Sequence, residues 1–417
     1  MDEPNQATHH QLRSFPYLCK HLPDEIFSSW FFRLAKGNSC DPYTFAHHLI
    51  NKGSLFGQDC DLQLPDRWIL TLQKKLNISD DIIRSSLLTS LIGNYVEDVS
   101  INGHDREILS GGTRGLFRRH NAQQFCPLCL QVDDQPYYRK QWRLTAMTIC
   151  TKHLIVLSDQ CRHCGASINC HRLTWFHRNS ACCFRCGKSL YNQLEITLDA
   201  KFPIVNFQKN LEEAMQTGWY VLSNGEIIRT PLLLEGLRFL SRPWFSKKKS
   251  ESLHQAFRDF TGLPFSTFQP NLFWPVRINR LNVKSRFNLY FVLAWLMEDW
   301  PRNLIGFCKH YGITLTAFYK TDAKPPYWIH KVFNSFLNKK VYWTTIDEIN
   351  SAARYLTSEN CLISPGNIAE VLGLDRSLHL TEERKSLIQK LSVTQKQNCS
   401  EPSRVFNWSK QDARWGR

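Results

Sequence analysis

The sequence predicts a mainly α-helical protein in which two helical regions flank one cysteine-rich segment. Three observations lead to this prediction. Patterns that start helices recur on both sides of the segment. Nine of the 15 cysteines lie between Cys126 and Cys186. The 417 residues carry a net charge of +15, and the first 120 of them contribute 13 basic and 14 acidic side chains, so the basic excess lies entirely after residue 120.

Residues 1–120 are expected to form an N-terminal helical domain of short helices in a helix-turn-helix-like arrangement. Capping, proline or acidic residues suited to a helix start precede apolar residues at helical spacing. Four such starts are present: Pro23-Asp24-Glu25, Asp41-Pro42, Pro65-Asp66 and Ser79-Asp80, the last leading a helix to Leu91. Glycines interrupt residues 102–120, which we therefore interpret as a loop.

Residues 121–193 contain four pairs of metal-ligand residues, each with a two-residue gap. A gap of two lets a tight turn point two side chains at one ion, and Gly165 and Gly187 tolerate the positive φ that such turns need. Thiolates and imidazole match Zn²⁺ in closed, four-coordinate structural sites. The sequence thus predicts a tandem zinc-finger or zinc-ribbon module with two zinc ions per chain and no catalytic residue. The expected ligands are Cys126, Cys129, Cys150, His153, Cys161, Cys164, Cys183 and Cys186.

Two alternatives stay open for these ligands. Sequential pairing places the first four ligands on one ion and the last four on the other, whereas a RING-type cross-brace interleaves them. Seven residues separate His153 from Cys161, which is long for a cross-brace and favours sequential pairing. Cys182 adjoins Cys183 and can replace it as a ligand.

The charge distribution indicates a polyanionic partner, with nucleic acid as the leading candidate. Residues 121–190 carry 9 basic and 3 acidic side chains, and residues 191–417 carry 30 and 20. Basic and aromatic residues interleave around the ligand pairs, which suits phosphate contacts and base stacking. The alternative is that Trp142 and Trp175 are the core of the module. Candidate DNA contacts here are Arg114, Arg118, Arg119, Arg139, Lys140, Arg143, Arg172 and Arg178.

Residues 194–392 are predicted to be a second helical domain, followed by a basic flexible tail at 393–417. Segments 307–320 and 364–376 each place a small residue four positions before a turn glycine, Gly312 or Gly373, as helix-turn-helix units do. An ordinary pair of antiparallel helices is the alternative. The candidate DNA contacts are Thr314, Thr316, Tyr319, Lys320, Arg376 and Ser377.

Several classes of protein are disfavoured by the sequence. No run of 18 or more apolar residues is present, so we expect no membrane span. The polar, acidic start Met1-Asp-Glu-Pro is not a secretory signal, which indicates a cytoplasmic protein. A metal-dependent nuclease or transposase needs clustered carboxylates for Mg²⁺, and no such spacing stands out. We therefore predict a protein that is not an enzyme, with that enzyme class as the alternative.

The order of motifs over residues 15–190 resembles the TniQ/TnsD family of bacterial transposition proteins. The resembling features are Pro23 and Glu25, Ser29-Trp30, Arg33-Leu34-Ala35, the Cys-Pro-x-Cys of residues 126–129, Trp142-Arg143, and the Cys-x-x-His and two Cys-x-x-Cys-Gly motifs that follow.

The resemblance implies a target selector that is not itself the strand-transfer enzyme. Such proteins bind DNA or an RNA-guided Cascade complex with its crRNA, and they hand the site to an AAA+ ATPase that recruits the transposase. The shorter TniQ type implies a homodimer docked on Cascade. The longer TnsD type implies a protein that reads a fixed attachment site in DNA by itself, and both types stay open.

Overall fold

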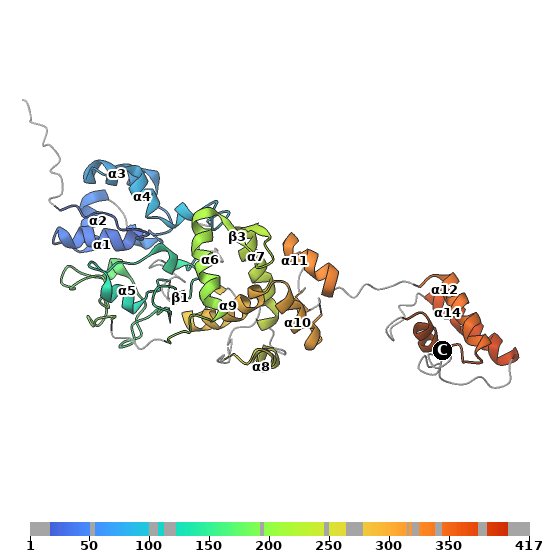
Figure 1. The fold of residues 1–417 in the computed structure, drawn as a ribbon. Helices are drawn as coiled ribbons and strands as arrows, with labels where there is room; N and C mark the ends of the chain where they lie inside the picture. The colour runs from blue at the N-terminus through green and yellow to red at the C-terminus, as the bar shows by residue number, and fades with distance from the viewer. Residues whose placement is uncertain are drawn as a thin grey trace, which may run out of the picture. The chain divides into compact units, whose positions relative to one another are not determined.

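The computed structural model describes residues 17–50, 55–99, 107–111, 122–191, 196–245, 250–263, 278–314, 317–318, 325–337, 344–373 and 382–398. The chain forms two compact units, Met1–Leu337 and Asn338–Arg417 (Figure 1). Helices dominate both, and the strands in the described ranges make up two short antiparallel hairpins. The mainly α-helical fold class is confirmed.

Four helices form the N-terminal part of the first unit: α1 (Phe27–Gly37), α2 (Pro42–Ile50), α3 (Asp66–Leu76) and α4 (Asp80–Ser85). Their apolar faces share one buried cluster that includes Phe31, Phe45 and Leu72. The predicted fourth helix is too long, because a 3-10 turn replaces its end at Leu88–Leu91. There the backbone N–H groups of Leu88 and Thr89 donate to the carbonyls of Asp61 and Leu62 instead of continuing the helix.

The cysteine-rich segment follows, with α5 (Pro127–Val132), β1 (Ile149–Cys150) and β2 (Ile155–Val156). The remaining elements of the first unit are α6 (Pro203–Thr217), β3 (Trp219–Val221), β4 (Ile227–Arg229), α7 (Thr230–Ser241), α8 (Ser250–Thr261), α9 (Val283–Glu298), α10 (Arg302–His310) and α11 (Tyr327–Val332), which continues as a π-helical turn at Phe333–Leu337. Helix α9 is buried almost all round, as expected of a central helix.

One apolar cluster joins the cysteine-rich segment to the helices on both sides of it. It runs from Ile26 and Phe32, through Trp142 and Val156, to α6, α9 and α11. The segment therefore packs against the N-terminal helices and against the helices that follow it (Figure 1). The predicted domain boundaries at residues 120 and 193 stay predictions.

The second unit contains three described helices, α12 (Ile346–Ser358), α13 (Pro365–Val371) and α14 (Glu382–Asn398). Thr345 and Glu348 form a reciprocal capping box at the start of α12, and Ser364 caps α13. The flexible tail predicted from residue 393 begins too early, since α14 continues to Asn398. The physical reason is Gln395, which accepts from the Ile363 N–H at 2.8 Å and donates to the Cys361 carbonyl at 2.8 Å.

No helix in the described parts of the chain is both long and apolar enough to cross a membrane.

Candidate metal centres and nucleic-acid interface

The first candidate metal centre brings together Cys126, Cys129, Cys150 and His153, whose ligand atoms all lie within 4.8 Å of one another. The Sγ atoms of Cys129 and Cys150 are 3.6 Å apart, and His153 Nδ1 lies 3.2 Å from the Cys129 Sγ. Tetrahedral coordination with zinc–sulfur bonds of about 2.3 Å places neighbouring sulfurs about 3.8 Å apart. The four donors therefore have the spacing of one tetrahedral ion site.

Two local structures position these ligands. Cys126 caps α5, where Pro127 takes the first helical position, so Cys129 falls in the first turn and its N–H donates to the Cys126 Sγ. Cys150 ends β1 and His153 lies in the turn that leads to β2, where Leu154 adopts φ +53°. Metal ligation needs the cysteines as thiolates and the histidine ring neutral, so binding of a cation to this group would release protons.

Helix α6 fixes the strand that carries Cys150. The side chain of Gln208 is fully buried, and its Oε1 accepts from the backbone N–H groups of Thr148 and Ile149 at 3.1 and 3.0 Å. Its Nε2 donates to the carbonyl of Ala146 at 2.7 Å. This supporting glutamine was not predicted, because it lies far along the chain from the ligands.

The second candidate metal centre brings together Cys161, Cys164, Cys183 and Cys186, again within 4.8 Å. Both halves are the same turn: the N–H of Gly165 or Gly187 donates to the carbonyl of Cys161 or Cys183, and both glycines have φ near +70°. The Lys188 backbone N–H lowers the pKa of the exposed Cys186 to about 7. The two groups follow the sequential pairing, and no cross-braced set occurs among the described residues.

The ambiguous neighbours lie outside both groups. The Cys182 Sγ lies 3.8 Å from Asn179 Oδ1 and belongs to neither ligand set. Cys170 is buried, and His171 stacks on Phe56 with ring centroids 5.0 Å apart. Burial lowers the pKa of His171 to about 4, so its ring is neutral in the folded protein at pH 7.

Three of the predicted DNA contacts cluster where the module meets the N-terminal helices. The guanidinium of Arg139 binds Asp133 and lies over the Trp142 ring at 4.7 Å. Lys140 Nζ donates to the Ser85 carbonyl at 2.6 Å. These two side chains are only 14% and 12% exposed, so most of their donor capacity serves the fold.

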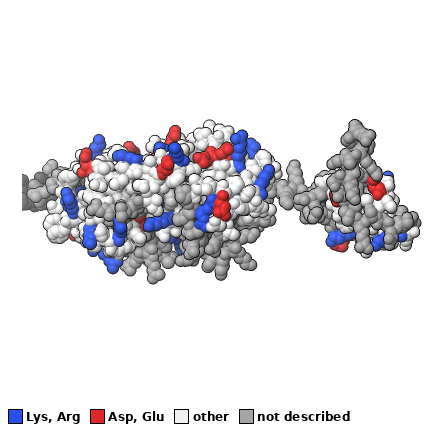
Figure 2. Space-filling view, turned by 60° about the horizontal axis from the view of Figure 1, so that its bottom comes forward, with Lys and Arg blue, Asp and Glu red and all other residues white. Residues whose placement is uncertain are grey.

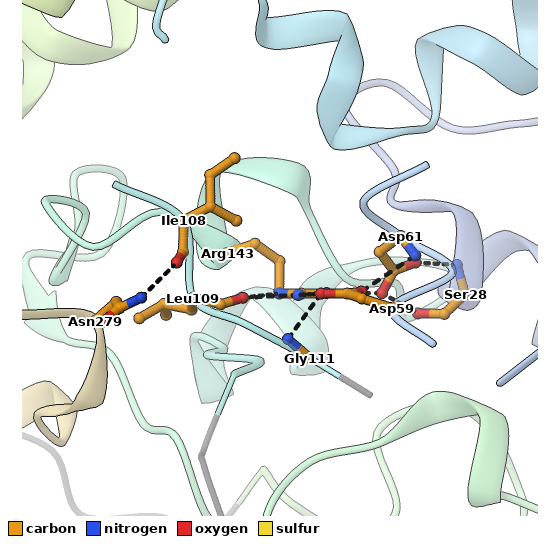
Figure 3. Close-up of polar contacts among 8 residues, drawn as sticks. All are labelled: Ser28, Asp59, Asp61, Ile108, Leu109, Gly111, Arg143 and Asn279. Atoms are coloured by element: carbon orange, nitrogen blue, oxygen red, sulfur yellow. Dashed lines mark hydrogen bonds and ion pairs between the residues drawn. The ribbon is translucent and has the colours of Figure 1, made fainter. Parts of the chain in front are cut away.

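Arg143 requires a correction, because its side chain is only 2% exposed. Its Nη2 and Nη1 donate to Asp59 at 2.5 Å and to Asp61 at 2.9 Å, and both Nη2 and Nε donate to the Leu109 carbonyl (Figure 3). Asp61 also accepts from the Ser28 N–H at 2.6 Å. Two carboxylates that lie 82 and 84 residues away in the sequence occupy the donors of this guanidinium. A single sequence cannot reveal contacts at that separation. Arg143 therefore presents no donor to nucleic acid at the surface.

Three other candidates are exposed: Arg172, Arg178 and Thr314. Arg172 lies over the Phe184 ring at 4.5 Å. On the face shown in Figure 2, Lys and Arg side chains are spread over the first unit, with Asp and Glu between them. The remaining candidates lie outside the described residues: Arg114, Arg118, Arg119, Thr316, Tyr319, Lys320, Arg376 and Ser377.

The residues that carry the family resemblance hold the N-terminal helices against the module. Glu25 is buried and binds Arg33 in an ion pair of 2.5 Å, while it accepts from Ser29 Oγ at 2.9 Å. Ser29 Oγ in turn accepts from the Tyr138 N–H at 3.0 Å. Burial raises the pKa of Glu25 to about 7 against the lowering effect of Arg33. These residues therefore serve an internal junction, not an exposed site.

Comparison with known families agrees with this arrangement. Residues 16–157 match the family model TniQ. The match includes the junction and the first candidate metal centre, and it ends before Cys161. No curated protein is significantly similar to the chain in sequence. A TniQ domain marks a protein associated with transposition, and residues 16–157 of this chain carry such a domain.

Proposed function

We propose that this protein selects target sites in DNA transposition as an adaptor without catalytic activity. It binds DNA, an RNA-guided Cascade complex with its crRNA, or both, and it recruits an AAA+ ATPase and through it the transposase. The observation that carries the proposal is the TniQ match over residues 16–157, and an apolar cluster continues from this region into the rest of the cysteine-rich module and α6–α11. The net charge of +15 supports a nucleic-acid partner.

We further propose that each ligand group holds one Zn²⁺, so that the chain carries two. Donor sets of three thiolates with one imidazole and of four thiolates match zinc, and neither group leaves a position for water. Metal bound in this way stabilises the fold and supplies no hydrolytic chemistry. Its role is to fix the loops that connect the N-terminal helices to α6.

The experiment that tests the targeting role compares two modes of binding by the zinc-loaded full chain. Footprinting on genomic fragments measures sequence-specific binding by the protein alone. Co-expression with a Cascade complex and affinity purification measures RNA-guided association. Either kind of binding supports the role of a target selector. Footprinting by the protein alone indicates the TnsD type, and co-purification with Cascade indicates the TniQ type. A chain that neither footprints nor co-purifies contradicts the proposal.

One feature of the second unit favours direct reading of an attachment site as a second candidate. Ser364 caps α13, and Gly373 follows that helix with φ +64°, as the helix-turn-helix interpretation of residues 364–376 requires. A separate compact unit of this kind suits a DNA reader that works without Cascade. Deletion of the unit would then abolish the footprint of the full chain.

A further inference from the structure

Two exposed aromatic side chains, Trp175 and Phe176, lie in the loop between Cys164 and Cys183. Trp175 is 43% exposed and Phe176 is 76% exposed, whereas Trp142 of the same module is only 1% exposed. The two rings stack on each other with centroids 4.0 Å apart and an interplanar angle of 28°. The alternative that both tryptophans form the module's core thus holds for Trp142 alone.

The backbone under these rings is held by the N-terminal helices. The Trp175 N–H donates to Asp41 Oδ1 at 2.8 Å, just before α2 begins. Lys36 Nζ, in the last turn of α1, donates to the carbonyls of Trp175 and His177 at 3.0 and 2.7 Å. The loop is therefore ordered before any partner binds, which reduces the entropy that binding must overcome.

The sequence on both sides of the two rings is basic. Between Cys161 and Tyr191 the sequence contains no Asp or Glu, and it contains five Arg or Lys. These five side chains are all exposed: Arg162, Arg172, Arg178, Arg185 and Lys188. The nearby carboxylate of Asp41 already accepts from the Trp175 N–H.

We propose that Trp175 and Phe176 form a stacking platform for unpaired bases of a nucleic acid, while exposed arginines of the same segment bind its phosphates. Stacking needs an open π-face, which duplex bases do not offer and single-stranded or looped bases do. An aromatic pair on a basic surface combines the two elements that bind single strands. A protein partner would be expected to place carboxylates opposite these arginines. The test must distinguish binding of such a protein from binding of a nucleic acid. The proposal rests on the proposed nucleic-acid-binding function and names the form of nucleic acid.

The test uses the zinc-loaded full chain with three probes of equal length: oligo(dT), oligo(U) and a DNA duplex. The variant is the double substitution W175A/F176A. The matched control is Trp219→Ala, which removes an indole of similar exposure, 52%, from the β3–β4 hairpin. Metal content and thermal unfolding show that each variant folds. The oligo(dT) and oligo(U) arms distinguish DNA from RNA as the source of the bases.

We expect the double variant to lose about tenfold or more in affinity for at least one single strand, because each stacked base contributes about 1–3 kcal/mol. Its duplex affinity should change by less than about twofold, as should all affinities of the control. A 5-bromouracil single strand should photo-crosslink to Trp175 or Phe176. Unchanged single-strand affinity of the double variant, or crosslinks only to residues other than Trp175 and Phe176, would overturn the platform. Neither result would contradict binding of duplex DNA by the chain. A wild-type chain that binds none of the probes overturns the platform and the DNA-binding form of the proposed function together, while association with Cascade is tested separately.

Discussion

Arg143 Nη1 donates to Asp61 Oδ2 across 2.9 Å in the interior of the first unit, and both side chains are less than a tenth exposed (Figure 3). Asp61 belongs to the N-terminal part of the chain and also holds the Ser28 N–H of α1. Arg143 belongs to the cysteine-rich module. The ion pair therefore joins two parts of the first unit through charges that are shielded from water.

Replacement of Arg143 by Met should lower the free energy of unfolding by about 3–5 kcal/mol, because it leaves the carboxylates of Asp59 and Asp61 buried without their cation. Urea unfolding measures this loss. The matched control is Arg84→Met, since Arg84 is 51% exposed and pairs with exposed Asp66 and Asp80. The control should lose less than about 1 kcal/mol. Equal losses in the two variants would disprove the role of burial.

Substitution of single cysteines should separate ligands from bystanders. Cys150→Ser and Cys183→Ser each remove one ligand of a different group, so each variant should retain about one zinc per chain instead of two. Cys182→Ser is the matched control, because its sulfur lies outside both groups. It should keep both ions. Elemental analysis of the purified proteins measures the metal, and a loss of zinc from the Cys182 variant alone would reassign the ligand.

The buried Glu25 should make stability fall as pH rises. Burial raises its folded pKa from 4.5 to about 7, so the folded state binds the proton more tightly than the unfolded state. This contribution is complete below pH 4.5 and disappears as the pH rises through 7. As the pH rises from 4.5 through 7, the unfolding free energy of wild type should therefore fall relative to that of Glu25→Gln. Half-buried His21, whose pKa burial lowers, acts in the opposite direction but is common to both proteins. A constant difference from pH 4.5 to 8 would contradict the assignment.

Truncation should locate the end of the second unit. A chain that stops after Asn398 keeps Gln395, whose amide joins α14 to the backbone of Cys361 and Ile363. A chain that stops after residue 392 loses both hydrogen bonds. Hydrogen exchange at the Ile363 amide should be unchanged in the longer chain and at least about tenfold faster in the shorter one, since a lost buried hydrogen bond costs about 1–3 kcal/mol. Equal exchange in both chains would disprove the role of Gln395.

The sequence was most informative where function depends on local spacing. The Cys-x-x-Cys and Cys-x-x-His turns are closed within a few residues, so their positions could be predicted without knowing the fold. Arg143 and Lys140 could not be separated from surface cations, since the carboxylates that bind Arg143 lie 82 and 84 residues away and the serines that bind Lys140 lie 50 and 55 residues away. The same limit applies to Trp175, whose exposure depends on backbone contacts with Lys36 and Asp41.

The most direct test of the central claim follows binding and cleavage in one reaction. The zinc-loaded full chain is incubated with labelled duplex DNA and Mg²⁺ over a range of salt concentrations, and in parallel with a Cascade complex. A target selector should bind the duplex, Cascade or both, leave every strand intact, and lose duplex affinity steeply as salt increases. Mg²⁺-dependent strand cleavage by the purified chain, or binding to neither partner, would contradict the account.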